Sequence, residues 1–399
     1  MTFTSFTIMA FIALISWLNF HLLERIFRFY NVWLVKYAYQ ALTAITVIVV
    51  GYGLTKHPSF AVPEYKLYQL FVYISIAWGI GQLLLLVFQP ILYVTHRLLR
   101  GKKKAAIKNT DLSGHRLTRR EFLHSTLAVA PLIAFGISSK GIYEAQSAIT
   151  IQRYSLSMPN LSSDITGFKI AQISDTHIGP YFGLNKLEMV LTQLKQEQPD
   201  LVVITGDLVD DLNLLKSSLA LIDAFQPLVP HGIYYCYGNH EYFHNIDFVR
   251  AEINKSRLIA LNNESQLIIA GHKPLYIMGV DYPWADQART GINVSATKRQ
   301  QYFATALKNV PVDAIKLLIA HHPDFLYDSF QKQVDLTLAG HTHGGQFTLF
   351  GKSLISSYAY MRGLYRNNGV YGYVSSGTGH WFPFRFNCPP EIGVFTLQA

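Results

Sequence analysis

Residues 201–210 read LVVITGDLVD, a short run of apolar and β-branched residues followed by Asp207. A run of this kind is typical of a buried strand. Residues 168–177 read FKIAQISDTH and repeat the arrangement, with Asp175 and His177 just past a second short strand. In α/β sheets the loops after the carboxyl ends of the strands converge on a ligand crevice. These two stretches therefore predict a sheet-based core and the edge of the sheet that carries a site.

The alternation of short strands with helical periodicity continues to the C-terminus. The expected strands cover 168–173, 201–205, 233–237, 267–270, 275–280, 316–320, 336–339, 371–375 and 392–397. The expected helices cover 184–196, 214–225, 247–255 and 296–308. Strands that alternate with helices predict an α/β domain, which we place at residues 154–399.

Four more polar residues stand just past other predicted strands: Asn239, His321, His341 and His343. Asp175 and His177 are separated by one residue, so an extended backbone can aim both side chains at one point. Carboxylates with imidazoles suit a borderline divalent ion such as Mn, Fe, Zn or Co. Since Asp207 could bridge two ions through its two oxygens, these seven residues are enough for two divalent ions. Such a pair of ions activates water and clamps a phosphoryl group, so the pattern predicts phosphoryl chemistry.

Any one of these residues, taken alone, would more simply be a hydrogen-bonded structural side chain. Their shared placement after five strands favours ligands. The histidines without that placement are interpreted as ordinary polar residues: His231, His244, His272 and His322.

Five motifs resemble, in this order, the calcineurin-like metallophosphoesterase family: Asp-x-His at 175–177, Gly-Asp-x-x-Asp at 206–210, Gly-Asn-His-Glu at 238–241, His-His-Pro-Asp at 321–324 and Gly-His-Thr-His-Gly-Gly-Gln at 340–346. The resemblance implies an α/β fold of four layers, an α/β/β/α sandwich. It also implies that one ion is held by Asp175, His177, Asp207 and His343, and the other by Asp207, Asn239, His321 and His341.

By the same resemblance, His240 is the catalytic histidine, which protonates the leaving oxygen or stabilises charge in the transition state. The alternative is that His240 only packs beside Asn239. Asp210 is expected to orient a neighbour rather than to bind metal. Arg385 could bind the phosphate of the substrate, because guanidinium pairs well with phosphate oxygens; an ion pair with Glu391 is the alternative.

The N-terminal part of the chain is apolar. Four uncharged runs are each long enough to cross a hydrocarbon core at about 1.5 Å per residue, and they predict transmembrane helices at about 5–23, 37–55, 67–95 and 122–139. We therefore expect an α-helical membrane region at 1–140 and a connector at 141–153. The fourth run is short and contains Pro131, and its alternative is a helix that lies along the membrane interface.

The formal net charge of +9 is concentrated in one segment. Residues 96–120 hold nine Lys and Arg against one acid, whereas residues 121–399 hold 20 basic and 22 acidic residues. This distribution argues against nucleic acid as a partner, because the basic residues are not on the catalytic domain. Short cytoplasmic loops are enriched in Lys and Arg, so the loop at 96–120 is predicted to lie inside. After a fourth span, the catalytic domain would then lie on the outer face of a bacterial inner (cytoplasmic) membrane; a fourth helix lying along the interface would leave it in the cytoplasm.

Two smaller features bear on localisation. Arg119 and Arg120 resemble an internal twin-arginine export signal, and the alternative is that they are two more positive-inside residues. Cys236 and Cys388 do not form a disulfide framework, and Cys236 is interpreted as a small buried hydrophobe.

The apolar helices, together with C-terminal residues 376–379, 383–385 and 390–392, resemble the branch of transmembrane proteins with a metallophosphoesterase domain. The prediction is a membrane-anchored enzyme that hydrolyses a phosphodiester, phosphomonoester or pyrophosphate bond of an envelope or lipid-linked substrate. Its expected partners are a phosphate ester and a lipid bilayer, with no obligate protein partner. One alternative is a pyrophosphohydrolase of UDP-2,3-diacylglucosamine in lipid A synthesis, with a cytoplasmic active site. A non-catalytic membrane scaffold is the other, although no ligand of the family set is missing.

Overall fold

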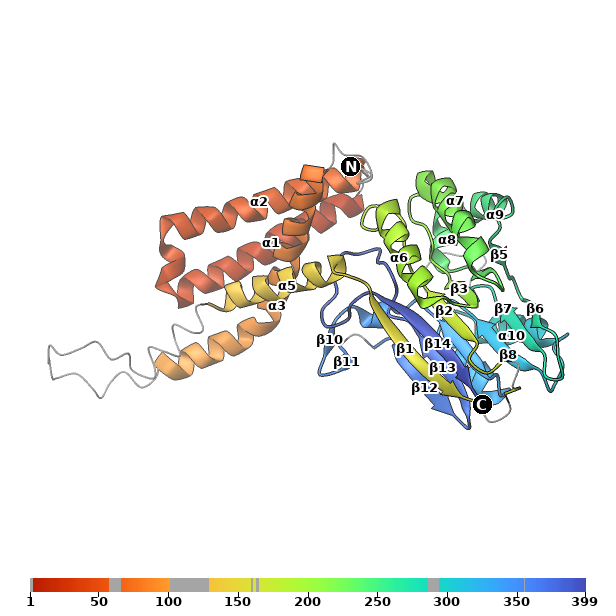
Figure 1. The fold of residues 1–399 in the computed structure, drawn as a ribbon. Coiled ribbons are helices and arrows are strands. Elements are labelled where there is room, and N and C mark those ends of the chain that lie inside the picture. Colours follow the sequence, from red (N-terminus) through yellow and green to blue (C-terminus); the bar gives the residue numbers. More distant parts are fainter. Residues whose placement is uncertain are drawn as a thin grey trace, which may run out of the picture. The chain divides into compact units, whose positions relative to one another are not determined.

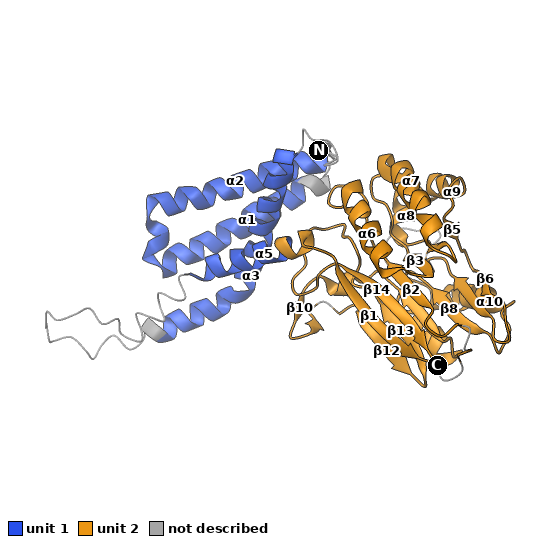
Figure 2. Cartoon of the chain, viewed as in Figure 1, with its two compact units in different colours: residues 1–58, 62–142 blue, residues 59–61, 143–399 orange. Residues whose placement is uncertain are grey.

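The structure is a computed structural model of the 399-residue chain, and it describes residues 3–56, 66–100, 129–158, 161–162, 165–285, 294–354 and 356–399. The chain divides into two compact units, which Figure 2 distinguishes by colour. The first unit covers 1–58 and 62–142, and the second covers 59–61 and 143–399. The described residues of the first unit form helices, whereas those of the second form an α/β domain (Figure 1).

Three helices of the first unit are long and apolar enough to cross a membrane, counted over its described residues. They are α1 (Phe3–Ile26), α2 (Trp33–Lys56) and α3 (Lys66–Arg100), and a short 3-10 turn, η1 (Arg28–Asn31), joins the first two. They coincide with the runs predicted at about 5–23, 37–55 and 67–95. Each helix extends beyond its uncharged run, because backbone hydrogen bonding continues into the polar flanks.

A buried polar cluster links these three helices. The side-chain oxygen of Gln82 on α3 accepts hydrogen bonds from Asn19 on α1 at 2.8 Å and from the hydroxyl of Tyr39 on α2 at 2.6 Å. Around it, Phe20 and Trp78 belong to an apolar core. Hydrogen bonds between apolar helices of this kind stabilise helix association where water is absent.

The fourth predicted segment corresponds in part to α5 (Ala130–Gln146). Pro131 occupies its first turn, where a missing backbone N–H costs no hydrogen bond. Residues 122–128 and most of the basic loop, including Arg119 and Arg120, lie outside the described residues. A fourth membrane span therefore stays a prediction. The connector expected at 141–153 differs from the structure, because α5 continues to Gln146 and the first strand begins at Thr150.

The second unit contains two six-stranded sheets within its described residues. The first has the order β1 (Thr150–Ser157), β14 (Glu391–Gln398), β2 (Lys169–Ile173), β3 (Leu201–Thr205), β4 (Ile233–Cys236) and β5 (Ile259–Ala260). The second has the order β12 (Gly363–Asn367), β13 (Val370–Val374), β9 (Leu336–Ala339), β8 (Ile315–Ile319), β7 (Leu275–Gly279) and β6 (Glu264–Ile269). A separate hairpin pairs β10 (Thr348–Leu349) with β11 (Lys352–Ser353).

The strands that lead to the predicted ligands are parallel to their neighbours in each sheet. These pairs are β2 with β3, β3 with β4, and β8 with β9. Parallel strands end at the same edge, so the segments that follow them meet. On its other side β2 pairs with β14 in antiparallel orientation, and the edge pairs β12 with β13 and β6 with β7 are also antiparallel.

Helices cover the outer face of each sheet. Helices α6 (Leu184–Glu197), α7 (Leu215–Phe225) and α9 (Ile246–Ile253) pack on the first sheet, and α10 (Ala296–Leu307) and α11 (Phe325–Gln331) pack on the second. On α6 the buried residues recur at helical spacing, as in Leu187, Val190 and Leu194. A central core, with Val203 of one sheet and Leu317 of the other, lies between the sheets. This is the predicted α/β/β/α sandwich (Figure 1).

Both cysteines are free and buried. Cys236 lies in the central core between the sheets, as predicted for a small apolar residue. The thiol of Cys388 donates to the backbone oxygen of His343 at 3.3 Å.

Candidate metal centre

The predicted ligand residues converge at the carboxyl ends of strands from both sheets. The first sheet contributes Asp175 and His177 after β2, Asp207 after β3 and Asn239 after β4, and the second contributes His321 after β8 and His341 and His343 after β9. All are buried except His341, which is partly buried. The residues that the sequence selected by their place after a strand are therefore neighbours in space.

One group of donor atoms lies around His177. Its Nε2 is 3.1 Å from Nε2 of His343 and 3.7 Å from Oδ2 of Asp207, and Nε2 of His343 is 3.7 Å from Oδ1 of Asp175. Two ligands about 2.1 Å from one tetrahedral ion stand about 3.4 Å apart. Asp175, His177 and His343 thus form a group whose donor atoms are close enough to hold one divalent ion, and Asp207 lies beside His177.

A second group lies around His321. Its Nε2 is 3.1 Å from Oδ2 of Asp207, 3.2 Å from Oδ1 of Asn239 and 3.1 Å from Nδ1 of His341. Asp207 belongs to both groups through the same oxygen. A carboxylate between two groups of donors is the arrangement that a bridging ligand needs.

Asp210 lies behind the first group. Its Oδ1 accepts from Nδ1 of His177 at 3.1 Å and from Nδ1 of His240 at 2.8 Å, and it is 3.3 Å from Nε2 of His244. A hydrogen bond to the far nitrogen of an imidazole fixes the ring's orientation and leaves the other nitrogen for a metal. The orienting role of Asp210 stays a prediction, because His177, Asp210 and His240 also form a group that could hold a metal ion. The contact of His244 was not predicted, because nothing in its local sequence sets it apart.

His240 occupies the first turn of α8 (Asn239–His244), and 20% of its side chain is exposed. Its ring lies 4.4 Å from the ring of His177, and its backbone N–H donates to Asp207 at 2.9 Å. Burial alone would lower the pKa of His240, but the Asp207 charge and the hydrogen bond to Asp210 raise it to about 9. The carboxylates of Asp207 and Asp210 therefore favour the protonated form of His240.

The pKa values of three predicted ligands are shifted towards the protonation states that bind metal. Burial and the neighbouring His321 lower the pKa of His341 to about 3. Burial, with His177 and Arg385 nearby, holds the pKa of His343 well below its usual range. Burial would raise the pKa of Asp207, but His321 and other imidazoles hold it well below its usual range. Neutral imidazoles and ionised carboxylates are the protonation states that bind metal. His321 and Asp175 shift the other way: burial would lower the pKa of His321, but the Asp207 charge raises it to about 10, and burial raises the pKa of Asp175.

Five of the seven predicted ligands have left-handed backbone conformations: Asp175, His177, Asp207, His341 and His343, with φ between 47° and 75°. This conformation costs an L-residue roughly 1–2 kcal/mol. Residues held in such conformations cluster at functional sites, where the surrounding structure maintains them. Here the left-handed conformation bends the chain after β2, β3 and β9, where these five residues lie.

Two side chains without a predicted role hold these loops. Buried Glu241 accepts from the backbone N–H groups of Gly238 at 2.9 Å, Leu208 at 2.6 Å and Asp207 at 3.2 Å. It therefore ties the loop after β3 to the loop after β4. Ser174 donates to the carboxylate of Asp175. The acidic residue at the end of the motif at 238–241 is the feature of the sequence that could have indicated a role for Glu241.

Aromatic residues border the second group of donors. The hydroxyl of Tyr358 lies 2.9 Å from Nε2 of His341, the nitrogen that points away from His321. The ring of Tyr282 lies 5.6 Å from the ring of His341 and 6.0 Å from that of His321. The sequence did not indicate either tyrosine, because each is remote from the motifs along the chain.

Arg385 does not lie where a substrate could reach it. Its side chain is fully buried, its Nη1 donates to the backbone oxygen of Ser376 at 2.6 Å, and its Nη2 lies 3.1 Å from Nδ1 of His343. Among the described contacts, Glu391 pairs with Arg362 at 3.7 Å rather than with Arg385. Both predicted roles of Arg385 therefore disagree with the structure, because its segment folds over His343 and backbone oxygens accept from the guanidinium.

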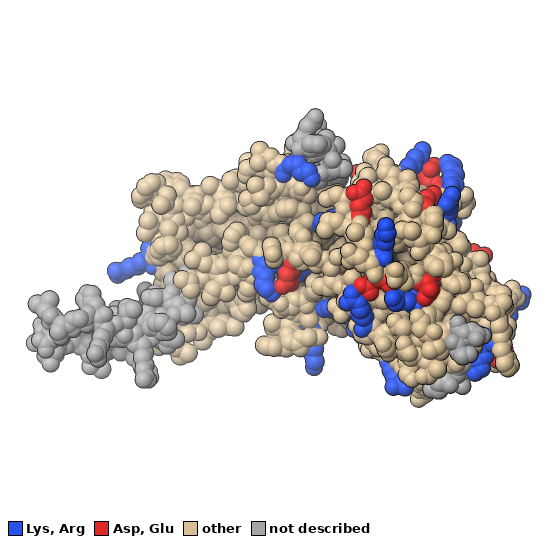
Figure 3. Space-filling model, viewed as in Figure 1, with Lys and Arg blue, Asp and Glu red and all other residues tan. Residues whose placement is uncertain are grey.

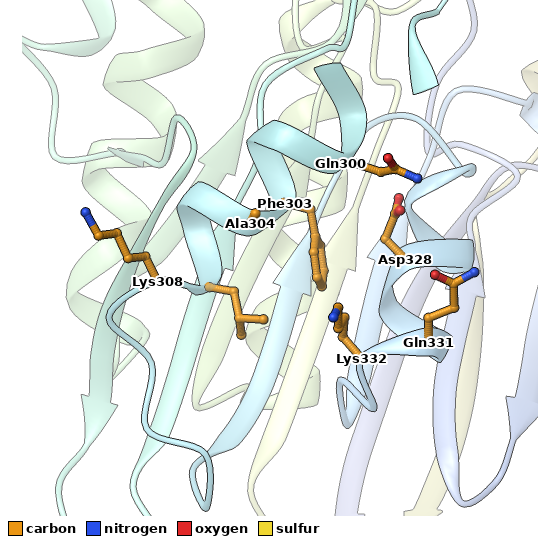
Figure 4. A pocket seen from close by; sticks show the side chains of 8 residues that line it. Gln300, Phe303, Ala304, Lys308, Asp328, Gln331 and Lys332 are labelled. Atoms are coloured by element: carbon orange, nitrogen blue, oxygen red, sulfur yellow. The ribbon is translucent and has the colours of Figure 1, made fainter. Parts of the chain in front are cut away.

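A separate hollow of about 530 Å³ opens between α10 and α11 (Figure 4). Phe303, Lys308, Asp328 and Lys332 are among the residues that line it. None of the predicted ligands contributes to this lining, so the hollow is distinct from the metal centre.

The comparisons with known proteins agree with the fold and with the family that the motifs resemble. Residues 168–345 match the Calcineurin-like phosphoesterase family. The chain is 30% identical over 265 residues to an uncharacterized metallophosphoesterase of Aquifex aeolicus. The aligned segment covers 63% of this chain and 92% of that protein. It is 28% identical over 303 residues to the metallophosphoesterase YkuE of Bacillus subtilis. This alignment covers 71% of this chain and 99% of YkuE. A bovine protein, "Transmembrane protein with metallophosphoesterase domain", is 28% identical over 295 residues. This alignment covers 71% of this chain and 64% of the bovine protein.

The chain therefore belongs to the calcineurin-like metallophosphoesterases, a class of metal-dependent phosphoric ester hydrolases. Its relatives include transmembrane proteins, and this chain carries three helices able to span a membrane within the part that the structure describes. The resemblance found in the sequence motifs is confirmed.

Proposed function

We propose that this chain is a membrane-anchored phosphoesterase with two divalent ions, which hydrolyses a phosphoester or pyrophosphate bond of an envelope or lipid-linked substrate. The observation that carries the proposal is the place of Asp207 between two groups of donors, 3.7 Å from His177 and 3.1 Å from His321. The proposed ligands of the first ion are Asp175, His177, Asp207 and His343. Those of the second ion are Asp207, Asn239, His321 and His341.

Two divalent ions at these residues would lower the pKa of bound water and neutralise charge on the phosphoryl oxygens. The protein would supply the proton for the leaving oxygen. His240 is placed for this role, because its ring is partly exposed beside the donors and Asp210 fixes its orientation. The P–O bond breaks as water adds to phosphorus, and the leaving oxygen departs as an alcohol or a phosphate.

The membrane supports the substrate class. Three helices able to span a bilayer belong to the same chain as the site. A tether of this kind confines the site to the neighbourhood of a membrane, where lipid-linked phosphates are concentrated. The complete set of ligand types argues against a non-catalytic scaffold, because a degenerate domain would lack some of them.

Removal of metal is the direct test of the proposed chemistry. Full-length protein stripped by a chelator is expected to lose its hydrolysis of a chromogenic bis-aryl phosphodiester, because the attacking water would no longer be activated. Addition of Mn²⁺ is expected to restore turnover, with two ions per chain by elemental analysis. Turnover that is unaffected by chelation, or a fully active protein with no bound metal, would contradict the proposal.

We further propose that the domain lies on the outer face of a bacterial inner membrane, as the positive-inside rule predicts. Alkaline phosphatase fused after Ala399 is then expected to be active, whereas a fluorescent protein that folds only in the cytoplasm is expected to stay dark. The opposite pair of results would place the site in the cytoplasm and favour a cytoplasmic nucleotide-linked lipid such as UDP-2,3-diacylglucosamine.

A further inference from the structure

The β10–β11 hairpin ends in an exposed apolar tip. Phe350 at the turn is 95% exposed, and Leu349 beside it is 39% exposed. Leu354, just past the hairpin, is 58% exposed. A soluble surface rarely gathers large apolar side chains at such exposure unless they bind something.

Folding does not explain the phenylalanine at this turn. Leu349 pairs with Lys352, so the turn contains only Phe350 and Gly351, with φ of 49° and 76°. Two-residue turns with positive φ favour Asn or Gly, and a bulky residue there is strained. Phe350 therefore accepts an unfavourable backbone conformation and buries almost none of its ring in return.

The base of the hairpin is fixed, in contrast to its tip. The backbone N–H of Thr348 donates to the oxygen of Phe386 at 2.9 Å, and that of Phe386 donates to Gln346 at 2.8 Å. The ring of Phe347 stacks on that of Phe386 at 4.8 Å. This base follows His343 within five residues, so the hairpin rises from the rim of the metal centre.

A cavity of about 360 Å³ lies at the hairpin and is lined by two basic residues, Lys352 and Arg362, together with Gly344 and Tyr365. From residue 336 to residue 390 there is no Asp or Glu, whereas Glu391, the next residue, pairs with Arg362 at 3.7 Å. In the view of Figure 3, no acidic side chain is seen over the β10–β11 hairpin. The hairpin itself therefore combines an apolar tip with the basic side chain of Lys352 and carries no acidic residue.

We propose that the tip of the β10–β11 hairpin inserts into the interface of an anionic lipid bilayer, with Lys352 on the lipid headgroups. Aromatic and aliphatic side chains insert about 5–10 Å at the boundary between headgroups and acyl chains. Basic side chains beside them contact anionic headgroups. The same chain carries helices able to span a bilayer, so lipid is the one partner always within its reach.

Site-specific labelling of the full-length protein tests this contact. Phe350→Cys is labelled with an environment-sensitive fluorophore, and the two native cysteines are buried and so protected from the reagent. Val312→Cys is the matched control, because Val312 is an apolar residue with 94% exposure in the loop before β8. Both proteins are placed in nanodiscs of phosphatidylcholine and phosphatidylglycerol that contain a spin-labelled lipid as quencher.

We expect the label at position 350 to be quenched several-fold more strongly than the label at position 312. In the Phe350→Cys protein, the additional change Lys352→Glu is expected to weaken the quenching, and more so in discs with phosphatidylglycerol than in discs of phosphatidylcholine alone. Equal quenching at the two positions would overturn the proposal. A label at position 350 that responds to protein concentration but not to lipid would also overturn it and indicate a protein–protein contact. The readout needs no turnover, so it stands or fails separately from the proposed hydrolysis.

Discussion

Asp207→Asn is expected to lower metal-dependent turnover by more than about 100-fold. Removing a side chain that only supports a metal ligand usually costs up to about 100-fold, and the loss of a ligand itself is expected to cost more. Asparagine has the shape of aspartate but no charge, so it can bridge two cations only weakly. Because Oδ2 of Asp207 stands in both groups of donors, both ions are expected to bind less tightly. Turnover of the aryl phosphodiester and bound metal per chain measure the two effects.

Asp211→Asn is the matched control, since Asp211 is four residues away and contacts Asn213 rather than the histidines. It is expected to keep both metal and turnover. If Asp207→Asn kept two tightly bound ions and normal turnover, Asp207 would not be the bridging ligand and the two-ion arrangement would be wrong.

His240→Gln is expected to lower kcat by about 10²–10⁴-fold, the usual contribution of a positioned general acid. Glutamine can retain a hydrogen bond to Asp210 but cannot deliver a proton. None of the proposed metal ligands is changed, so metal content is expected to stay normal. This separation of turnover from metal binding distinguishes His240 from Asp207.

The leaving group provides a sharper test of the role of His240. A nitrophenyl ester departs with little help from an acid, whereas a phenyl or alkyl ester needs protonation. The loss caused by His240→Gln is therefore expected to be larger with the poorer leaving group. His272→Gln, at an exposed position between β6 and β7, serves as the control. An equal loss with both esters would indicate that His240 stabilises charge on the phosphoryl group instead of donating a proton.

Local sequence was sufficient to predict the strands whose own residues mark them as buried. The strands at 201–205 and 336–339 were predicted with their observed bounds, because an apolar run between polar residues marks a buried strand by itself. The strands β1 and β12 were missed. β1 is only partly buried along most of its length, and its parallel pairing with β14 joins residues about 240 positions apart along the chain, as at Thr150 and Glu391. No pattern in the local sequence indicates which distant strand will pair with β1.

The sequence by itself determined which residues stand at the ends of the strands, and therefore the class of chemistry. It also determined which helices are able to span a membrane. These features depend on the order of residues over short distances, where hydrophobic periodicity and motif spacing act. Only the tertiary structure decided that His177 and His343, 166 residues apart, face each other at 3.1 Å with Asp207 between the two groups. It also decided that Arg385 is buried and that Phe350 is exposed, because burial depends on segments that come together only when both sheets are folded.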